Sequence, residues 1–212
     1  MQEDVVRVFN ENVNEYEDWF IQNHWAYQTE LEAVRQLIPF NRKGIEIGVG
    51  SGRFAVPLGI GTGVDISEDM LAKAREYGVN AIVADANALP FEDNSFDFAL
   101  MVVSICFMDD PFKALSEAKR VVNSGGKIIV GIVDKDSELG RIYLKKKQKS
   151  KFYRYARFFS SNEVLELFKK VGIEFSEARQ CLFSPDISSM NKVGPVKYGY
   201  GQGGFVALSG EK

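Results

Sequence analysis

The sequence predicts a doubly wound α/β domain, because apolar runs and capped amphipathic segments alternate along the chain from residue 44 onward. Short runs such as "GIEIG" and "KIIVGIV" are apolar at almost every position. Strands that are apolar on both faces are typical of a parallel sheet covered by helices on each side. The chain has 212 residues, of which 45% are hydrophobic and 26% charged, and this composition fits one globular fold.

Residues 1–40 are predicted to form an N-terminal helical cap. Aromatic and aliphatic residues recur there at three- and four-residue spacing from Tyr16 to Ile38, and Pro39 ends the pattern. Residues 41–212 form the second predicted unit, which carries the alternating strands and helices.

The strands and helices of this second unit follow one another in a regular order. The predicted strands cover 44–48, 62–66, 80–85, 96–105, 127–133, 173–183 and 203–210. The predicted helices cover 67–78, 110–122 and 160–172, and each begins at a capping residue: Ser67, Asp110 before Pro111, and Ser160 in a capping box with Glu163. The short stretch between Gly52 and Asp65 contains Pro57, so we expect its helix to be stunted.

Composition and charge exclude several classes of protein. Two isolated cysteines, Cys106 and Cys181, and one histidine, His24, argue against a metal site and favour a reducing, cytoplasmic location. The polar N-terminus does not resemble a signal peptide, and no apolar run is long enough to span a membrane. The net charge of −3 argues against a protein that coats nucleic acid over its whole surface.

A glycine-rich turn follows the first predicted strand. In "GIEIGVGSGRF" the glycines Gly48, Gly50 and Gly52 are spaced two apart, and Glu46 stands within the strand. Doubly wound folds bind their ligands at the carboxyl edge of the sheet, where this turn lies. A dinucleotide-binding turn has the spacing GxGxxG, whereas here Arg53 occupies the place of the third glycine. The turn alone also fits a tight strand-to-helix connection without a ligand.

Two aspartates end the next two predicted strands. Asp65 lies at the end of the second strand, where a carboxylate accepts hydrogen bonds from ribose hydroxyls. Asp85 ends the third strand and is followed by Ala86 and by the apolar residues Leu89 to Phe91, a combination that suits an adenine ring. Either aspartate alone also fits a helix cap or a strand end. Together, downstream of the glycine-rich turn, they predict a cofactor that contains a nucleoside.

The motifs in their order resemble those of class I S-adenosylmethionine-dependent methyltransferases. The resemblance covers about residues 40–133 and rests on "GIEIGVGSGRFAVPLGIGTGVDIS", "VADANALPF", "FDFALMVVSICFMDD" and "ALSEAKRVVNSGGKIIV". The most similar group is that of small enzymes related to ubiquinone and menaquinone methyltransferases. The resemblance implies a seven-stranded Rossmann-like sheet with the order 3-2-1-4-5-7-6, in which the last strand is antiparallel. It also implies S-adenosylmethionine as cofactor and S-adenosylhomocysteine as product.

The same resemblance implies roles for single residues. Glu46 orients the loop and the amino acid end of the cofactor, Asp65 binds the ribose, and Val103 and Ser104 border the sulfonium and its methyl group. Tyr16 folds over the cofactor, although a core aromatic of an amphipathic helix is the alternative interpretation. The full set of predicted cofactor-binding residues is Tyr16, Glu46, Gly48, Gly50, Gly52, Asp65, Ile66, Asp85, Ala86, Val103 and Ser104.

Methyl transfer from a sulfonium is an in-line displacement, which needs alignment more than acid or base catalysis. Holding the two reactants together contributes roughly 7 to 11 kcal/mol. If the methyl acceptor must lose a proton, Tyr16, His24 and Asp109 are the candidate bases. For His24, a packed helix residue is the alternative. The leading hypothesis is an enzyme that methylates a small molecule.

Residues 139–160 form a predicted insert that combines basic and aromatic side chains. Its eight basic residues, without an acidic one between them, are Arg141, Lys145, Lys146, Lys147, Lys149, Lys151, Arg154 and Arg157. One interpretation is a solvated lid whose aromatic residues pack on the sheet edge. The other is a surface for an anionic methyl acceptor or for RNA phosphates.

Three other functions stay open at this point. One is a methyltransferase that acts on RNA or another polyanion through residues 141–157. Another is a module that binds S-adenosylmethionine without catalysis. An NAD-dependent oxidoreductase is the third, and the GxGxG spacing and the pair Asp85-Ala86 disfavour it.

Overall fold

The computed structural model, which describes residues 2–212, contains a mixed β-sheet with the order β3-β2-β1-β4-β5-β8-β6-β7. The strands are β1 Gly44–Ile47, β2 Thr62–Asp65, β3 Asn80–Val83, β4 Phe96–Val102, β5 Val122–Val133, β6 Glu174–Cys181, β7 Lys197–Tyr198 and β8 Phe205–Glu211. Strands β1 to β5 are parallel, and β8 is antiparallel to both β5 and β6. The predicted α/β fold and its strand order are therefore confirmed.

The strand count differs from the prediction by one. The eighth strand, β7, consists of two exposed residues that pair with β6 at the edge of the sheet. Two exposed residues carry no apolar pattern, so the sequence gives no signal for this strand.

Eight helices and four 3₁₀ turns surround the sheet within the described residues. The helices are α1 Gln2–Glu11, α2 Val13–Gln22, α3 His24–Arg35, α4 Ala55–Leu58, α5 Glu68–Glu76, α6 Pro111–Val121, α7 Glu138–Lys146 and α8 Ser161–Val171. The 3₁₀ turns are η1 Ile105–Phe107, η2 Lys147–Lys149, η3 Tyr153–Tyr155 and η4 Ile187–Ser189. None of the helices within residues 2–212 is long and apolar enough to cross a membrane.

The local signals at the helix ends act as expected. Ser67 accepts a hydrogen bond from the backbone of Met70, and Ser160 and Glu163 form the complete capping box of α8. Helix α4 has only four residues, as predicted for the stretch that contains Pro57. Such caps depend on residues within one turn, so the sequence alone specifies them.

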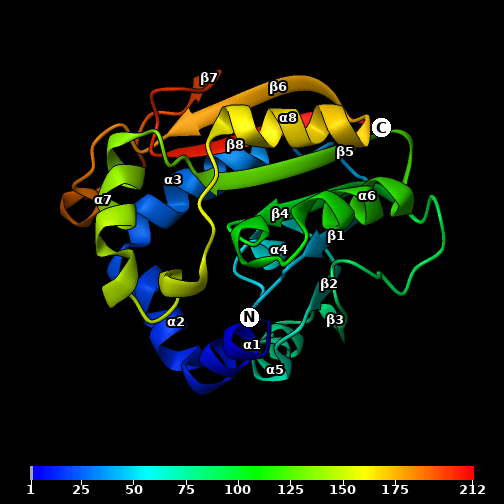
Figure 1. The fold of residues 1–212 in the computed structure, drawn as a ribbon, viewed down its shortest axis with the longest axis horizontal. Coiled ribbons are helices and arrows are strands. Elements are labelled where there is room, and N and C mark those ends of the chain that lie inside the picture. The colour runs from blue at the N-terminus through cyan, green and yellow to red at the C-terminus, as the bar shows by residue number, and fades with distance from the viewer. Residues whose placement is uncertain (1) are drawn as a thin grey trace.

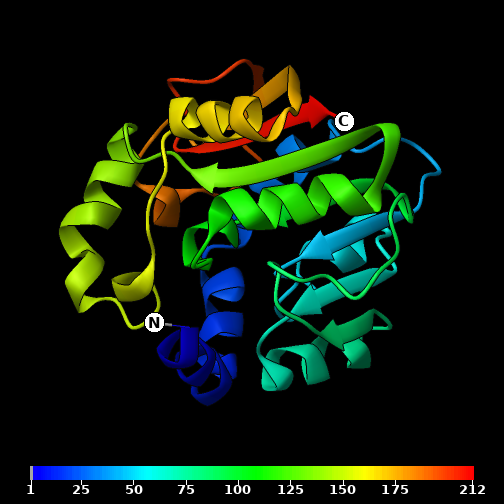
Figure 2. The ribbon, with the colours of Figure 1, turned by 45° about the vertical axis from the view of Figure 1, so that its right-hand side comes forward.

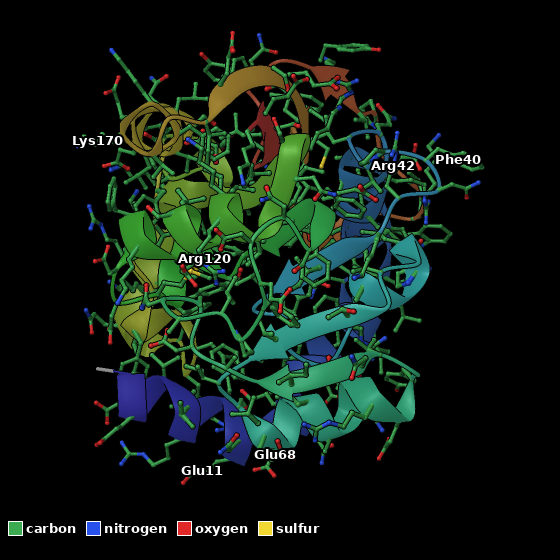
Figure 3. All side chains as sticks on the ribbon, turned by 90° about the vertical axis from the view of Figure 1, so that its right-hand side faces the viewer. Glu11, Phe40, Arg42, Glu68, Arg120 and Lys170 are labelled. Carbon is green, nitrogen blue, oxygen red and sulfur yellow. The ribbon has the colours of Figure 1, made fainter. Side chains whose placement is uncertain are left out.

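Helices cover both faces of the sheet (Figure 1). Helices α6 and α8 pack against each other and against β4, β5, β6 and β8 on one face, whereas α3 contacts β6 and β8 from the other. In Figure 3, Arg120 of α6 and Lys170 of α8 therefore lie on one side of the molecule, and Phe40, beyond the end of α3, lies on the other.

The N-terminal helices have two different places in the fold. Helix α3 belongs to the layer that covers the sheet, and its Ala26, Leu31 and Val34 are buried. Helices α1 and α2 instead lie at the end of the sheet to which the arrowheads of β1, β2 and β5 point, near α7 (Figure 2). The predicted boundary after residue 40 stays a prediction, and Met1 of the predicted cap lies outside the described residues.

Candidate functional site

A cavity of about 510 Å³ opens at the carboxyl ends of the parallel strands. The ends of β1 to β5 form its floor, and α1, α2, α3 and the insert at residues 139–160 supply its walls. Ligands of doubly wound folds bind at this edge, where successive strands leave the sheet and their loops diverge. Strand ends that are far apart in the sequence thus meet around one space.

Most of the predicted site residues line this cavity. Those in the lining are Tyr16, Gly48, Gly50, Asp65, Ile66, Asp85, Ala86, Val103, Ser104 and Asp109. Glu46 and Gly52 are buried and do not belong to the lining. His24 is different, because it is exposed, lies outside the lining and packs its ring against Trp25. His24 therefore does not face the cavity in this structure, and its candidate role as a base stays a prediction.

The glycine-rich turn passes very close to the end of β4. Gly48 has a φ of +77°, and a Cβ atom at this position would lie 2.4 Å from Cβ of Ser104. The hydroxyl of Ser104 donates a hydrogen bond of 2.8 Å to the carbonyl of Ile47, which fixes the two strand ends against each other. A side chain on residue 48 would therefore force β1 and β4 apart.

Alanine in place of Gly48 is expected to lower the free energy of unfolding by about 2–4 kcal/mol, because the left-handed backbone and the contact with Ser104 both oppose a Cβ atom. Urea denaturation measures this loss. The matched control is Gly61→Ala, where an added Cβ meets nothing within 4 Å and the change should stay within about 1 kcal/mol. Equal stability of the two variants would contradict the close approach of the two strands.

Asp65 connects the glycine-rich turn to the end of β2. Its Oδ2 accepts a hydrogen bond of 2.9 Å from the backbone N–H of Gly50, and its Oδ1 accepts one of 3.0 Å from Ser67. Burial raises the pKa of this carboxyl, and the backbone N–H groups that bind it act in the opposite direction. The carboxylate thus holds the turn in place while it faces the cavity.

The end of β4 is conformationally strained. Val103 has a φ of +50°, which is rare for a β-branched residue. Its N–H donates a hydrogen bond of 2.8 Å to the carbonyl of Gly131, and its side chain borders the cavity. Strain of this kind persists where the surrounding structure imposes it and clusters at functional sites.

Glu46, in the strand before the turn, and Tyr16, whose hydroxyl lies beside Gly50, are two further predicted site residues near the turn. Glu46 is 2% exposed, and its Oε2 has no hydrogen-bond partner among the described residues. Burial raises the pKa of Glu46 well above its usual value. The Tyr16 hydroxyl lies 3.3 Å from the position that a Cβ of Gly50 would take. Burial is the main cause that raises the pKa of Tyr16, and the charges of Glu46 and Asp65 raise it further.

Helix α2 is attached to the turn by a partly buried ion pair. Glu17, which is 8% exposed, accepts hydrogen bonds from the Ser51 hydroxyl and from the guanidinium of Arg53. Arg53 is the residue that replaces the third glycine of a dinucleotide-binding turn. Its contact with Glu17 gives it a structural function that the sequence did not reveal.

The polar groups of the cavity suit S-adenosylmethionine better than a dinucleotide. In the part of the chain that the structure describes, no Lys, Arg or His side chain lines the cavity, so nothing there pairs with a pyrophosphate. Asp65 and Asp85 offer carboxylates to hydroxyl and amino groups. The unpartnered oxygen of Glu46 suits a ligand with a positive charge. Among residues 2–212 no group of three His, Cys, Asp or Glu side chains could hold a metal ion.

Several lining residues were not predicted from the sequence. Among them are the acidic residues Glu15, Asp18 and Glu30 and the aromatic residues Trp19, Tyr143 and Tyr153. Glu30 could have been identified from the sequence, because it is a carboxylate on the apolar, buried face of α3, between Ala26 and Val34. The aromatic residues of the insert were noted, but their positions toward the cavity depend on how residues 139–160 fold back.

Comparisons with known proteins agree with this geometry. Residues 45–130 match the family model described as a methyltransferase domain. An uncharacterised protein of Methanocaldococcus jannaschii is 48% identical over 207 residues, which is 98% of this chain and 100% of that protein. A demethylmenaquinone methyltransferase of Staphylococcus aureus is 33% identical over 99 residues, or 41% of each chain.

A solved structure extends the similarity over almost the whole chain. The S-adenosylmethionine-dependent methyltransferase of Thermotoga maritima is 52% identical, with a TM-score of 0.94, over 97% of this chain and 99% of that one. Identity and coverage at this level mean that the two chains share their fold and their cofactor. The chain belongs to the class I S-adenosylmethionine-dependent methyltransferases.

Proposed function

We propose that this enzyme transfers the methyl group of S-adenosylmethionine to a nitrogen atom of a small amine inside the cavity. In this proposal Asp65 binds the ribose, and Asp85 with Ala86 binds the adenine. Glu46, Tyr16 and the glycine-rich turn hold the methionine part, and Val103 and Ser104 border the methyl group. When bound, the cofactor supplies a methyl group that its sulfonium has already activated. The protein then has to align the methyl acceptor and exclude water.

The observation that carries the proposal is the charge of the cavity. Its ionisable lining residues are carboxylic acids and tyrosines, namely Glu15, Tyr16, Asp18, Glu30, Asp65, Asp85, Asp109, Tyr143 and Tyr153. Two of the carboxylates have proposed roles toward the cofactor, which leaves several that face the remaining space. Acidic and aromatic walls favour a cationic or neutral methyl acceptor over an anionic one.

The similar protein of Thermotoga maritima supports the same chemical class. It is described as a possible histamine N-methyltransferase. At 52% identity the two enzymes are similar enough for a shared class of methyl acceptor to be a reasonable proposal for this chain.

The basic residues of the insert do not favour an anionic acceptor in the cavity. Seven of the eight are exposed, Lys147 is half-buried, and none is in the lining. Some bind neighbouring parts of the protein: Lys151 pairs with Glu15, and Arg141 donates to the carbonyl of Asp136. Three aromatic residues of the same insert, Tyr143, Phe152 and Tyr153, line the cavity instead.

Release of S-adenosylhomocysteine is the measurement that tests this proposal. We expect turnover with small amines such as histamine, 2-phenylethylamine and tyramine, and little or none with quinones, phenols, carboxylic acids or RNA. Turnover should change less than about twofold between 50 and 200 mM salt, because salt screens a charge pair inside a buried cavity much less than contacts between exposed lysines and phosphates. Turnover of RNA with a steep loss in salt would instead support the exposed basic residues as the binding surface. Cofactor binding without turnover of any compound would indicate a non-catalytic module.

A further inference from the structure

Glu30 is a buried carboxyl group without a partner. It is 5% exposed, lies on α3 and lines the cavity. Within residues 2–212 no side chain or backbone group donates a hydrogen bond to its carboxylate, although buried carboxylates are almost always paired. Burial alone raises its pKa to about 8. The carboxylate oxygens of Glu30 are not among the fully enclosed atoms without a partner, so they are open to the cavity, where a bound ligand can supply a hydrogen-bond partner.

Aromatic side chains surround the space in front of Glu30. Trp19 of α2, Tyr143 of α7 and Tyr153 of η3 line the same cavity, and the rings of Tyr143 and Tyr153 lie 5.3 Å apart. Burial is the main cause that raises the pKa of both tyrosines, and the charge of Glu30 raises it further. Helices α2, α3 and α7 meet at this end of the molecule (Figures 1 and 2). Aromatic faces around a carboxylate attract a cation, which binds to both.

We infer that Glu30 binds the cationic nitrogen of the methyl acceptor and takes its proton. This inference rests on the proposed function, because it names the residue that would recognise an amine in the same cavity. The step is balanced within the complex: one N–H bond of the ammonium breaks, one O–H bond forms on the Glu30 carboxylate, and the nitrogen keeps the electron pair. That pair makes the amine nucleophilic. The proton on Glu30 passes to solvent when the product leaves.

The other ionisable groups around Glu30 stay neutral near pH 7. They are Tyr143 from α7, Tyr153 from η3 and Cys181 from β6, and burial raises the pKa of each above its usual value. Glu15 and Asp18 of α2 also line the cavity, but unlike Glu30 they are exposed. Glu30 is therefore the group in this part of the cavity whose ionisation responds to a cation between pH 6 and 8.

Proton release on binding tests the inference without relying on activity. At pH 7 a carboxyl with a pKa of about 8 is mostly protonated, so binding of an ammonium ion should release close to one proton. We would saturate the enzyme with S-adenosylhomocysteine and titrate it with 2-phenylethylamine by calorimetry, in phosphate and in Tris. The difference between the two buffers gives the number of protons. The neutral analogue 2-phenylethanol should release none.

Glu30→Gln keeps the shape of the side chain and removes its ionisation. We expect this variant to release no proton, to bind 2-phenylethylamine at least about 30-fold more weakly, and to lose about 100-fold in kcat/KM. Its affinity for S-adenosylhomocysteine should be unchanged. The control Glu32→Gln alters a carboxylate two positions along α3 that pairs with Arg35 outside the cavity, and it should match the wild type in every measurement.

The outcomes separate the inference from the proposed function. Turnover of amines by the wild type, with equal turnover and equal proton release in Glu30→Gln, would overturn the inference and leave the proposed function standing. An amine that binds no more tightly than 2-phenylethanol would also overturn it. If the wild type methylates no amine at all, the proposed function fails, whatever Glu30 binds.

Discussion

Replacement of Asp65 by alanine is expected to weaken the binding of S-adenosylhomocysteine at least 100-fold. Hydrogen bonds to a charged group contribute about 1.5–3 kcal/mol each, so the loss of two ribose contacts corresponds to a factor of roughly 10² to 10⁴. The turn would loosen as well, because the Asp65 carboxylate holds the N–H of Gly50 and of Ser67. Calorimetric titration with S-adenosylhomocysteine measures the effect.

The control for Asp65 is an aspartate that cannot reach the cofactor. Asp69 lies four positions later, exposed in the first turn of α5, and Asp69→Ala should bind S-adenosylhomocysteine like the wild type. Circular dichroism of both variants checks that the fold is intact. An unchanged affinity in a folded Asp65→Ala protein would mean that the ribose assignment is wrong.

Glu30→Gln is expected to stabilise the free protein at alkaline pH. The pKa of Glu30 is raised from 4.5 to about 8 by burial, so the folded protein holds this proton more tightly than the unfolded chain. The resulting stabilisation is complete below pH 4.5 and is lost as the pH rises from there to about 8. The shift corresponds to at most about 5 kcal/mol. Glutamine carries no ionisable proton and does not lose this free energy.

Thermal unfolding at pH 5 and at pH 9 measures the difference. We expect the wild type and Glu30→Gln to be similar at pH 5, and the variant to have a Tm higher by about 10 °C at pH 9. Glu32→Gln should follow the wild type at both values. A lower Tm for Glu30→Gln at pH 9 would mean that the carboxylate has a stabilising partner in the folded protein. Higher stability together with lower activity would show that this position is optimised for binding.

Local patterns of the sequence predicted the elements that lie within one helix turn or one strand. The capping box of Ser160 and Glu163 and the short helix near Pro57 were predicted because each depends on neighbouring residues only. The alternation of strands and helices gave the fold class, and the resemblance to methyltransferases gave the strand order. Strand β7 was not predicted, because its two exposed residues pair with β6 through backbone hydrogen bonds, which no pattern of residue types indicates.

The candidate site, too, could be predicted only in part from the sequence. Gly48, Asp65, Asp85 and Ser104 each follow a predicted strand, and parallel strands end at the same edge, so their meeting could be predicted. The location of His24 could not be predicted, because both faces of α3 carry aromatic residues and only packing decides which one is exposed. The roles of these residues toward the cofactor stay predictions that the variants above test.

By itself the sequence determined the α/β fold, the strand ends that surround the cavity and the class of cofactor. The first two depend on periodicity and on residues at fixed distances along the chain, and the cofactor is what the resemblance to methyltransferases implies. Only the tertiary structure decided which side chains face the methyl acceptor. The insert folds back so that Tyr143 and Tyr153 line the cavity while most of its lysines are exposed, and Glu30 of α3 lines the same space. Contacts between segments more than 100 residues apart determine these orientations, and local sequence patterns cannot predict such contacts.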